Sequence, residues 1–131
     1  MNKVNKFALH TDTECKVNGQ GQTDTSLLTD GARDGPSSSS GCMVNDVRTS
    51  SFGQGLNAAG GGYYIVEWDS DAIRTWLFDR RNIHASLVDS EPDTSEFGIP
   101  AANFQGDCDI VKRFQDQRFI FPNNFCGNWA G

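Results

Sequence analysis

The sequence predicts an all-β sandwich or barrel with long loops and little helix. β-Branched and aromatic residues gather in short runs, of which Tyr63-Tyr64-Ile65-Val66 is the clearest. Apolar residues rarely recur at the 3.6-residue period of an amphipathic helix. Glycine, serine, asparagine and aspartate, which favour turns, are frequent, and hydrophobic residues make up only 37% of the chain. These three observations favour strands and loops over helices.

The first half of the chain is expected to hold one strand and one long loop. Side chains at residues 4–10 fall alternately on two faces, which indicates a strand. Residues 11–57 are polar and include several glycines and a run of serines from Ser37 to Ser40. Such a stretch buries too little apolar surface to order itself. We therefore expect a long polar loop that is pinned to the rest of the domain.

A hairpin over residues 63–79 is the central expected element. Two β-branched and aromatic runs flank a short polar turn at residues 70–72. Residues 80–107 are expected to be mostly loop, because prolines and glycines interrupt them. One or two helical turns are expected within residues 109–116, and a last strand at residues 118–121. The prediction is one partial domain over residues 1–131, because about four strands are few for such a fold.

Composition excludes several classes of partner. The net charge is −6, with 17 acidic and 11 basic residues, which argues against a nucleic acid or an anionic membrane surface. No apolar run approaches the ~20 residues of a membrane span. The N-terminal residues alternate and contain no apolar core of a signal peptide, so none is expected in this chain.

Four cysteines, Cys15, Cys42, Cys108 and Cys126, offer three ways to form two disulfides. None forms a C-x-x-C pair, and structural zinc ligands usually come in close pairs, so no metal site is expected. We predict the bonds Cys15–Cys42 and Cys108–Cys126, because each closes a local loop. Disulfides would imply an oxidising compartment. Four buried thiols in a cytosolic protein are the alternative.

Short motifs follow one another in order along most of the chain. They are Leu9-His10-Thr11 with Cys15, the stretch Leu56 to Tyr64, Glu67-Trp68, Ile73-Arg74, Trp76 and Phe78, Pro92-Asp93, Phe97 to Pro100, Cys108-Asp109-Ile110, Phe114, Phe125-Cys126-Gly127 and Trp129-Ala130-Gly131. Together they resemble glycoside hydrolase family 16, especially its fungal endo-1,3(4)-β-glucanase branch. Phe97 stands where that family usually has tryptophan, and Asn128 where it usually has aspartate.

The resemblance implies a partial β-jelly-roll sandwich and retaining hydrolysis of β-1,3 or mixed β-1,3/1,4 glucans. A retaining mechanism needs two carboxyl groups about 5–5.5 Å apart. The family places them on one strand, as E-x-D-x-x-E or E-x-D-x-E, just before the L-H-T segment. No such motif precedes His10 here. We therefore expect a piece of a β-glucan endo-hydrolase that is inactive by itself, with no catalytic residue and no cofactor.

Two acidic stretches imitate the missing motif. Residues 91–96 spell E-x-D-x-x-E, but Pro92 removes a backbone donor and indicates a loop. Glu67, Asp69 and Asp71 alternate, but the two aspartates bracket the expected hairpin turn and should point to solvent. Neither stretch combines the required spacing with a rigid strand.

By resemblance, four residues are expected to contact β-glucan: His10, Glu67, Asn128 and Trp129. The indole of Trp129 could stack on a pyranose ring. His10 could instead make an ordinary hydrogen bond at a strand end, and Glu67 could be an outward carboxylate. One or both of Trp68 and Trp76 are expected in the core rather than at a ligand.

The resemblance also implies an extracellular protein. Two other functions stay open at this point: a non-catalytic glucan-binding domain, and a disulfide-linked structural domain. A jelly roll without some of its strands would leave open sheet edges, which a partner chain could cover.

Overall fold

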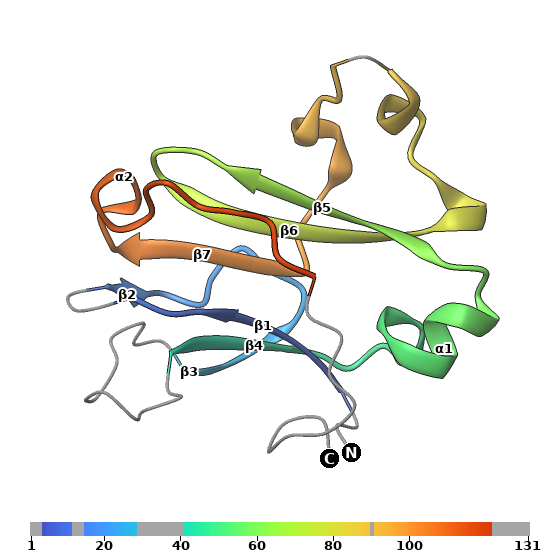
Figure 1. Ribbon diagram of the computed structural model, residues 1–131, viewed down its shortest axis with the longest axis horizontal. Helices are drawn as coiled ribbons and strands as arrows, with labels where there is room; N and C mark the ends of the chain where they lie inside the picture. Colours follow the sequence, from blue (N-terminus) through green and yellow to red (C-terminus); the bar gives the residue numbers. More distant parts are fainter. Residues whose placement is uncertain (1–3, 12–14, 29–40, 90, 122–131) are drawn as a thin grey trace.

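The computed structural model describes residues 4–11, 15–28, 41–89 and 91–121, and it contains two antiparallel sheets (Figure 1). The three-stranded sheet has the order β1-β4-β3. Its strands are β1 (Asn5–Leu9), β4 (Cys42–Asp46) and β3 (Thr25–Leu28). The four-stranded sheet has the order β2-β7-β6-β5. Its strands are β2 (Lys16–Val17), β7 (Ala102–Asp107), β6 (Ala72–Asp79) and β5 (Gly62–Trp68).

Helices are short in the described part of the chain. The α-helices are α1 (Gly53–Ala58) and α2 (Ile110–Arg113), and the 3₁₀ helices are η1 (Thr49–Ser51), η2 (Arg80–Asn82), η3 (Ala85–Val88) and η4 (Thr94–Phe97). Antiparallel sheets with so little helix confirm the predicted all-β class. The helical turns expected within residues 109–116 correspond to α2.

The hydrophobic core lies between the two sheets. Leu9 pairs with Cys42 in the β1–β4 ladder, and because paired residues share one face, both side chains point into the core. Ala102 and Phe104 of β7 face them from the other sheet, and all four side chains are buried. Burial of these apolar side chains holds the sheets together.

The hairpin predicted at residues 63–79 is confirmed. β5 and β6 pair without interruption from Gly62 opposite Asp79 to Trp68 opposite Ile73. In the turn, the Asp69 carboxylate accepts hydrogen bonds from the backbone N–H groups of Asp71 at 2.7 Å and Ala72 at 2.8 Å. These local bonds explain why a short polar segment closes the hairpin at this point.

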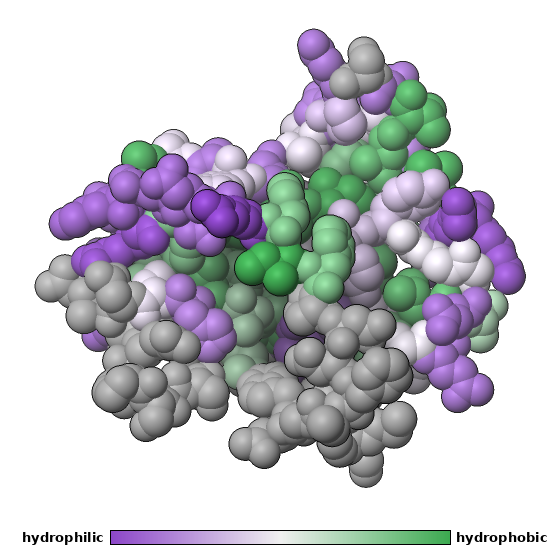
Figure 2. Space-filling model, in the orientation of Figure 1, coloured by the Kyte–Doolittle hydropathy of each residue, from purple (hydrophilic) through white to green (hydrophobic). Residues whose placement is uncertain are grey.

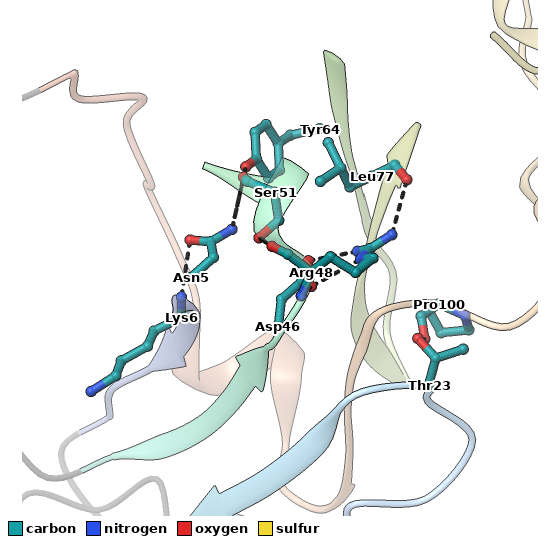
Figure 3. A network of polar contacts seen from close by, with 9 residues as sticks. All are labelled: Asn5, Lys6, Thr23, Asp46, Arg48, Ser51, Tyr64, Leu77 and Pro100. Atoms are coloured by element: carbon teal, nitrogen blue, oxygen red, sulfur yellow. Dashed lines mark hydrogen bonds and ion pairs between the residues drawn. The ribbon is translucent and has the colours of Figure 1, made fainter. Parts of the chain in front are cut away.

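A polar network links the sheets near one end of the core (Figure 3). Asp46 of β4 is fully buried, and the Arg48 guanidinium donates to both of its carboxylate oxygens, at 2.9 and 2.6 Å. The same guanidinium donates to the backbone carbonyl of Leu77 in β6 at 3.4 Å. The hydrogen bond to Asp46 is the main cause of a raised pKa at Arg48. Arg48 therefore neutralises a buried charge and joins the two sheets.

Several strands lie where the sequence predicts loop. β2, β3 and β4 fall within residues 11–57, and β7 falls within residues 80–107. The residues of β7 include no β-branched side chain, so composition does not reveal it. These segments become strands because neighbouring strands satisfy their backbone hydrogen bonds.

The strand predicted at residues 118–121 is wrong. These residues are not in a strand, and Phe119 and Phe121 are almost fully exposed. No strand in the described part of the chain pairs with them. Aromatic and β-branched composition alone therefore does not make a strand.

The predicted disulfide pairings, Cys15–Cys42 and Cys108–Cys126, are also wrong, because Cys15 bonds to Cys108 across 93 residues. The β2–β7 ladder explains the bond: Lys16 pairs with Asp107, so the residues next to them stand opposite each other. The expectation of local loops overlooked this ladder. Cys42 is buried in the core, and Cys126 lies outside the described residues.

Gly106 allows β2 to come this close to β7. A Cβ atom at position 106 would lie 2.5 Å from the Lys16 carbonyl oxygen, and φ is +151°. A residue with a side chain would therefore push the strands apart beside the disulfide.

Candidate functional site

A groove opens on the side of the sandwich where β1 and β5 lie. Its volume is about 450 Å³. The residues that line it are Ala8, Leu9, His10, Val66, Trp68, Ile73, Phe114, Gln117, Arg118 and Phe119. Most of them are aliphatic or aromatic, so the groove fits apolar side chains better than sugar hydroxyls. Figure 2 shows hydrophobic residues gathered in the middle of the face in view.

His10 lies at this groove, directly after β1, and its side chain is exposed. Gly41, just before β4, lies against it: a Cβ atom at position 41 would be 2.5 Å from Nδ1 of His10 and 2.6 Å from the Leu9 carbonyl oxygen. The position of the imidazole therefore depends on a residue without a side chain. Sequence reasoning missed Gly41, because only the β1–β4 pairing brings it close to His10.

Glu67 lies on the other face of the hairpin. Its carboxylate is 2.6 Å from the guanidinium of Arg74, which stands directly opposite in β6, and it accepts a hydrogen bond from the Thr94 hydroxyl. Arg74 also contacts Asp69 at 2.7 Å. Two carboxylates thus share one guanidinium, and the pKa of Arg74 is raised, first by its bond to Glu67. A pocket of about 330 Å³ lies here, lined by Glu67, Arg74, Trp76, Thr94, Ser95, Gly98 and Pro100.

The structure does not bring His10 and Glu67 together. Successive side chains of a strand point to opposite faces, and Val66 and Trp68, the neighbours of Glu67, are the residues that line the His10 groove. Asn128 and Trp129 lie outside the described residues. His10 and Glu67 therefore lie on opposite faces of the sheet that contains this hairpin.

A cluster of aromatic rings covers the Glu67 face of β6. Trp76 is 5% exposed, as expected for the core, and contacts Phe97 of η4 edge to face at 5.7 Å between ring centroids. His84 packs against Phe97 at 5.2 Å, and its Nδ1 is 2.8 Å from the Ser86 hydroxyl oxygen. Trp68, in contrast, is 47% exposed, so only Trp76 fulfils the expected core role.

The residues that imitate a catalytic motif are placed as expected. Residues 91–96 form loop and the start of η4, and no strand carries them. Asp93 begins η4 and accepts hydrogen bonds from the hydroxyl and the backbone N–H of Ser95, which lower its pKa. Asp69 is exposed, as expected, although Arg74 contacts it, and its pKa is lowered mainly by the Asp71 N–H.

Two further properties concern the described ranges as a whole. None of their helices has the length and apolar character needed to cross a bilayer. In the same ranges, no three histidine, cysteine, aspartate or glutamate side chains group in a way that suits a metal ion.

Known proteins resemble this chain along its whole length. A family model described as the XgeA-like, catalytic GH16 domain matches residues 1–131. A probable endo-1,3(4)-β-glucanase of Neosartorya fischeri is 44% identical over 131 residues. Endo-1,3(4)-β-glucanase xgeA of Emericella nidulans is 40% identical over 128 residues. The chain spans 20% of the length of each of these two relatives.

Solved structures share the fold. An elongating GH family 16 β-1,3-glucosyltransferase superposes with a TM-score of 0.77 and 37% identity, covering 87% of this chain and 38% of that one. Laminarinase 16A of Phanerochaete chrysosporium, with β-glucans in its donor and acceptor sites, gives a TM-score of 0.76 at 26% identity, covering 85% of this chain and 39% of that one. The predicted partial jelly-roll sandwich is thereby confirmed.

Proposed function

The chain belongs to glycoside hydrolase family 16, in its XgeA-like group of catalytic domains. We propose that it forms part of the glucan-binding framework of a β-1,3(4)-glucan hydrolase. The observation that carries this proposal is the family match over all 131 residues. The relatives are an endo-1,3(4)-β-glucanase and a laminarinase, and these activities suggest the substrate class.

In this proposal His10 is a sugar contact. Its imidazole is exposed at the rim of a groove, and an imidazole nitrogen can donate to or accept from a sugar hydroxyl. Asn128 and Trp129 remain proposed contacts by resemblance alone. Glu67 is the weakest of the four, because Arg74 and Thr94 already engage its two oxygens.

We further propose that this chain releases no sugar by itself. A retaining pair needs one carboxylate as nucleophile and one carboxyl group as acid. Glu67 and Asp69 both form ion pairs with the guanidinium of Arg74, so these two carboxylates bind the hairpin's own arginine instead of forming a retaining pair. Purified chain should therefore produce no reducing ends from laminarin or barley β-glucan. Release with retained configuration would refute this part of the proposal.

Binding tests the proposal separately from hydrolysis. In native gels that contain laminarin, the chain should migrate more slowly than in gels without it. His10→Ala should reduce this retardation, whereas His84→Ala should not, since His84 lies in the aromatic cluster on the Glu67 face. Equal retardation of all three proteins would show that His10 does not contribute to glucan binding. Absence of retardation in the unmodified chain would contradict glucan binding and would favour a structural role for the domain.

Transfer of glucosyl units is a second candidate activity of the domain. It is favoured by the 37% identity to an elongating β-1,3-glucosyltransferase. Products longer than the supplied laminari-oligosaccharide would distinguish transfer from hydrolysis.

The disulfide supports a secreted location. The chain contains the disulfide Cys15–Cys108. Disulfides persist in oxidising compartments and are rare in the cytosol. We propose that the chain acts outside the cell. Detection of the reduced pair in protein isolated from its native source would argue against this location.

A further inference from the structure

Asn18 and Gly19 form the one Asn-Gly pair in the sequence, and they directly follow β2 (Figure 1). In such a pair the backbone nitrogen of the glycine can attack the side-chain amide of the asparagine, because glycine has no Cβ atom to obstruct the approach. The local structure around Asn18 decides whether this chemistry takes place in the folded chain.

The side chain of Asn18 is held along the backbone that follows it. Its Oδ1 accepts a hydrogen bond from the backbone N–H of Gln20 at 2.9 Å, which is the bonding pattern of an Asx turn. Gly19 lies between the two bonded residues, so the turn directs the side-chain carbonyl carbon of Asn18 toward the Gly19 nitrogen. The hydrogen bond also draws electrons toward Oδ1, which makes this carbon a better target for a nucleophile.

Gly19 has the conformation that keeps this arrangement without strain. Its φ is +67°, in the left-handed region that glycine adopts readily. The N–H of Asn18 donates to the Gln105 carbonyl at 2.9 Å and extends the β2–β7 ladder by one residue, and Gly19 lies beyond that bond. Asn18 is exposed, so water and base can reach its side-chain amide.

We propose that Asn18 is a site of spontaneous deamidation in the folded chain. The Gly19 nitrogen gives up its proton and forms a bond to Cγ of Asn18, while the Cγ–Nδ2 bond breaks and ammonia leaves with that proton. The product is a cyclic imide. Water then opens the imide at one of its two carbonyl carbons. Attack at Cγ gives aspartate, and attack at the main-chain carbonyl carbon gives isoaspartate, in which the backbone runs through the former side chain.

The segment after Gly19 packs closely on β7. Asn103 of β7 is buried, and its side-chain amide donates to the Gln20 carbonyl at 2.9 Å. Its backbone N–H donates to Oε1 of Gln22 at 3.0 Å. A Cβ atom at Gly21 would lie 3.1 Å from Nδ2 of Asn103, so the segment has little room to shift.

Isoaspartate would disturb this packing. It lengthens the backbone by one carbon atom between positions 18 and 19, while the ladder bond of Asn18 and the disulfide Cys15–Cys108 hold the preceding residues against β7. The added length must therefore be taken up by residues 20–22. We expect both of their hydrogen bonds with Asn103 to weaken, whereas aspartate at position 18 keeps the backbone length and should preserve them.

Peptide mass spectrometry of the purified chain, kept folded at mildly alkaline pH, tests the reaction, because base removes the Gly19 proton. The peptide that contains Asn18 should gain one mass unit with time and separate into an aspartate and an isoaspartate form. Asn57 and Asn82 are controls within the same chain. Both are exposed, but alanine and isoleucine follow them, so their peptides should stay unchanged.

Two variants locate the reacting atoms. Gly19→Asn should abolish the conversion, because asparagine tolerates a positive φ but carries a side chain that obstructs the attack. Asn18→Gln should also abolish it, because the longer side chain closes a ring less readily. The second variant keeps the glycine, so it leaves the backbone conformation of the segment available.

Hydrogen exchange tests the consequence for β7. The backbone amide of Asn103 should exchange faster in the isoaspartate form than in the unmodified chain. Asn18→Asp is the matched control, since a carboxylate can still accept from the Gln20 N–H and the backbone keeps its length. Its Asn103 amide should exchange as slowly as that of the unmodified chain.

Three results would overturn the assignment of Asn18 as a deamidation site. They are conversion that occurs only after unfolding in urea, equal conversion at Asn57 or Asn82, and conversion that persists in Asn18→Gln. Unchanged exchange at Asn103 in the isoaspartate form would overturn the predicted effect on β7.

Discussion

At the scale of single residues, the ion pair between Asp46 and Arg48 is asymmetric. Asp46 is fully buried, whereas the Arg48 side chain is 42% exposed. Removing the arginine leaves an anion without its partner in the core, but removing the aspartate leaves a cation that water can reach. The two partners should therefore contribute unequally to stability.

We expect Arg48→Ala to lower the free energy of unfolding by about 3–5 kcal/mol. Asp46→Asn should cost less, about 1–3 kcal/mol, because only hydrogen bonds are lost. Urea unfolding followed by fluorescence measures both, with the exposed Val47→Ala as a nearly neutral control. Equal losses for the two variants would contradict the asymmetry.

The carboxyl group of Asp24, just before β3, should make the stability of the fold depend on pH. Burial raises its pKa, the nearby Asp46 charge adds to this, and Arg48 opposes it. The folded chain thus binds this proton more tightly than the unfolded chain does. Stability from this group is present in acid and is lost as the pH rises from the unfolded pKa through the folded pKa.

Asp24→Asn should therefore stabilise the chain at neutral pH. Its advantage over the unmodified chain should shrink as the pH falls through that interval, because the protonated carboxyl resembles the amide. Urea midpoints of both proteins at several pH values measure this difference. A constant difference from acid to neutral pH would contradict the assignment.

At the scale of elements, the hairpin turn depends on one carboxylate. Asp69 accepts two backbone hydrogen bonds in the turn and contacts Arg74. Asp69→Ala should cost about 1–2 kcal/mol, whereas Asp69→Asn should cost less because an amide oxygen can still accept. The pKa of Asp69 is lowered, so its charge stabilises the fold above the unfolded pKa, and this stability is lost as the pH falls through the folded pKa. Unfolding midpoints should show the gap between the unmodified chain and the Asp69→Asn variant closing in acid.

Elements with strong local signals were predictable, and elements made by pairing were not. The hairpin at residues 63–79 follows from β-branched and aromatic runs around a turn. β7 and β4 draw their strand character from neighbours in the ladder, and residues 118–121 lack a described neighbour despite their composition.

The Glu67–Arg74 pair could have been found, because a turn at residues 70–71 sets these two residues opposite each other. The contact between Gly41 and His10 needs the β1–β4 register, which local sequence does not contain.

At the scale of the whole molecule, one covalent bond spans most of the chain. Cys15–Cys108 joins residues 93 apart, and a bond over such a distance restricts the unfolded chain strongly. Replacing both cysteines by alanine should lower the free energy of unfolding by about 4–5 kcal/mol. The urea midpoint of the double variant should match that of the unmodified chain under reductant. An unchanged midpoint would show that the ladder alone fixes β2 on β7.

The same bond determines what a protease would leave behind. The long connection between β6 and β7 is exposed at Val88 and Ile99, and it lies inside the ring that the disulfide closes. A single nick there would produce two peptides that remain one molecule, held by sulfur as well as by the β6–β7 ladder. On a denaturing gel the cleaved protein would therefore migrate as one species until reductant is added. Digestion of this protein has to be followed under reducing conditions.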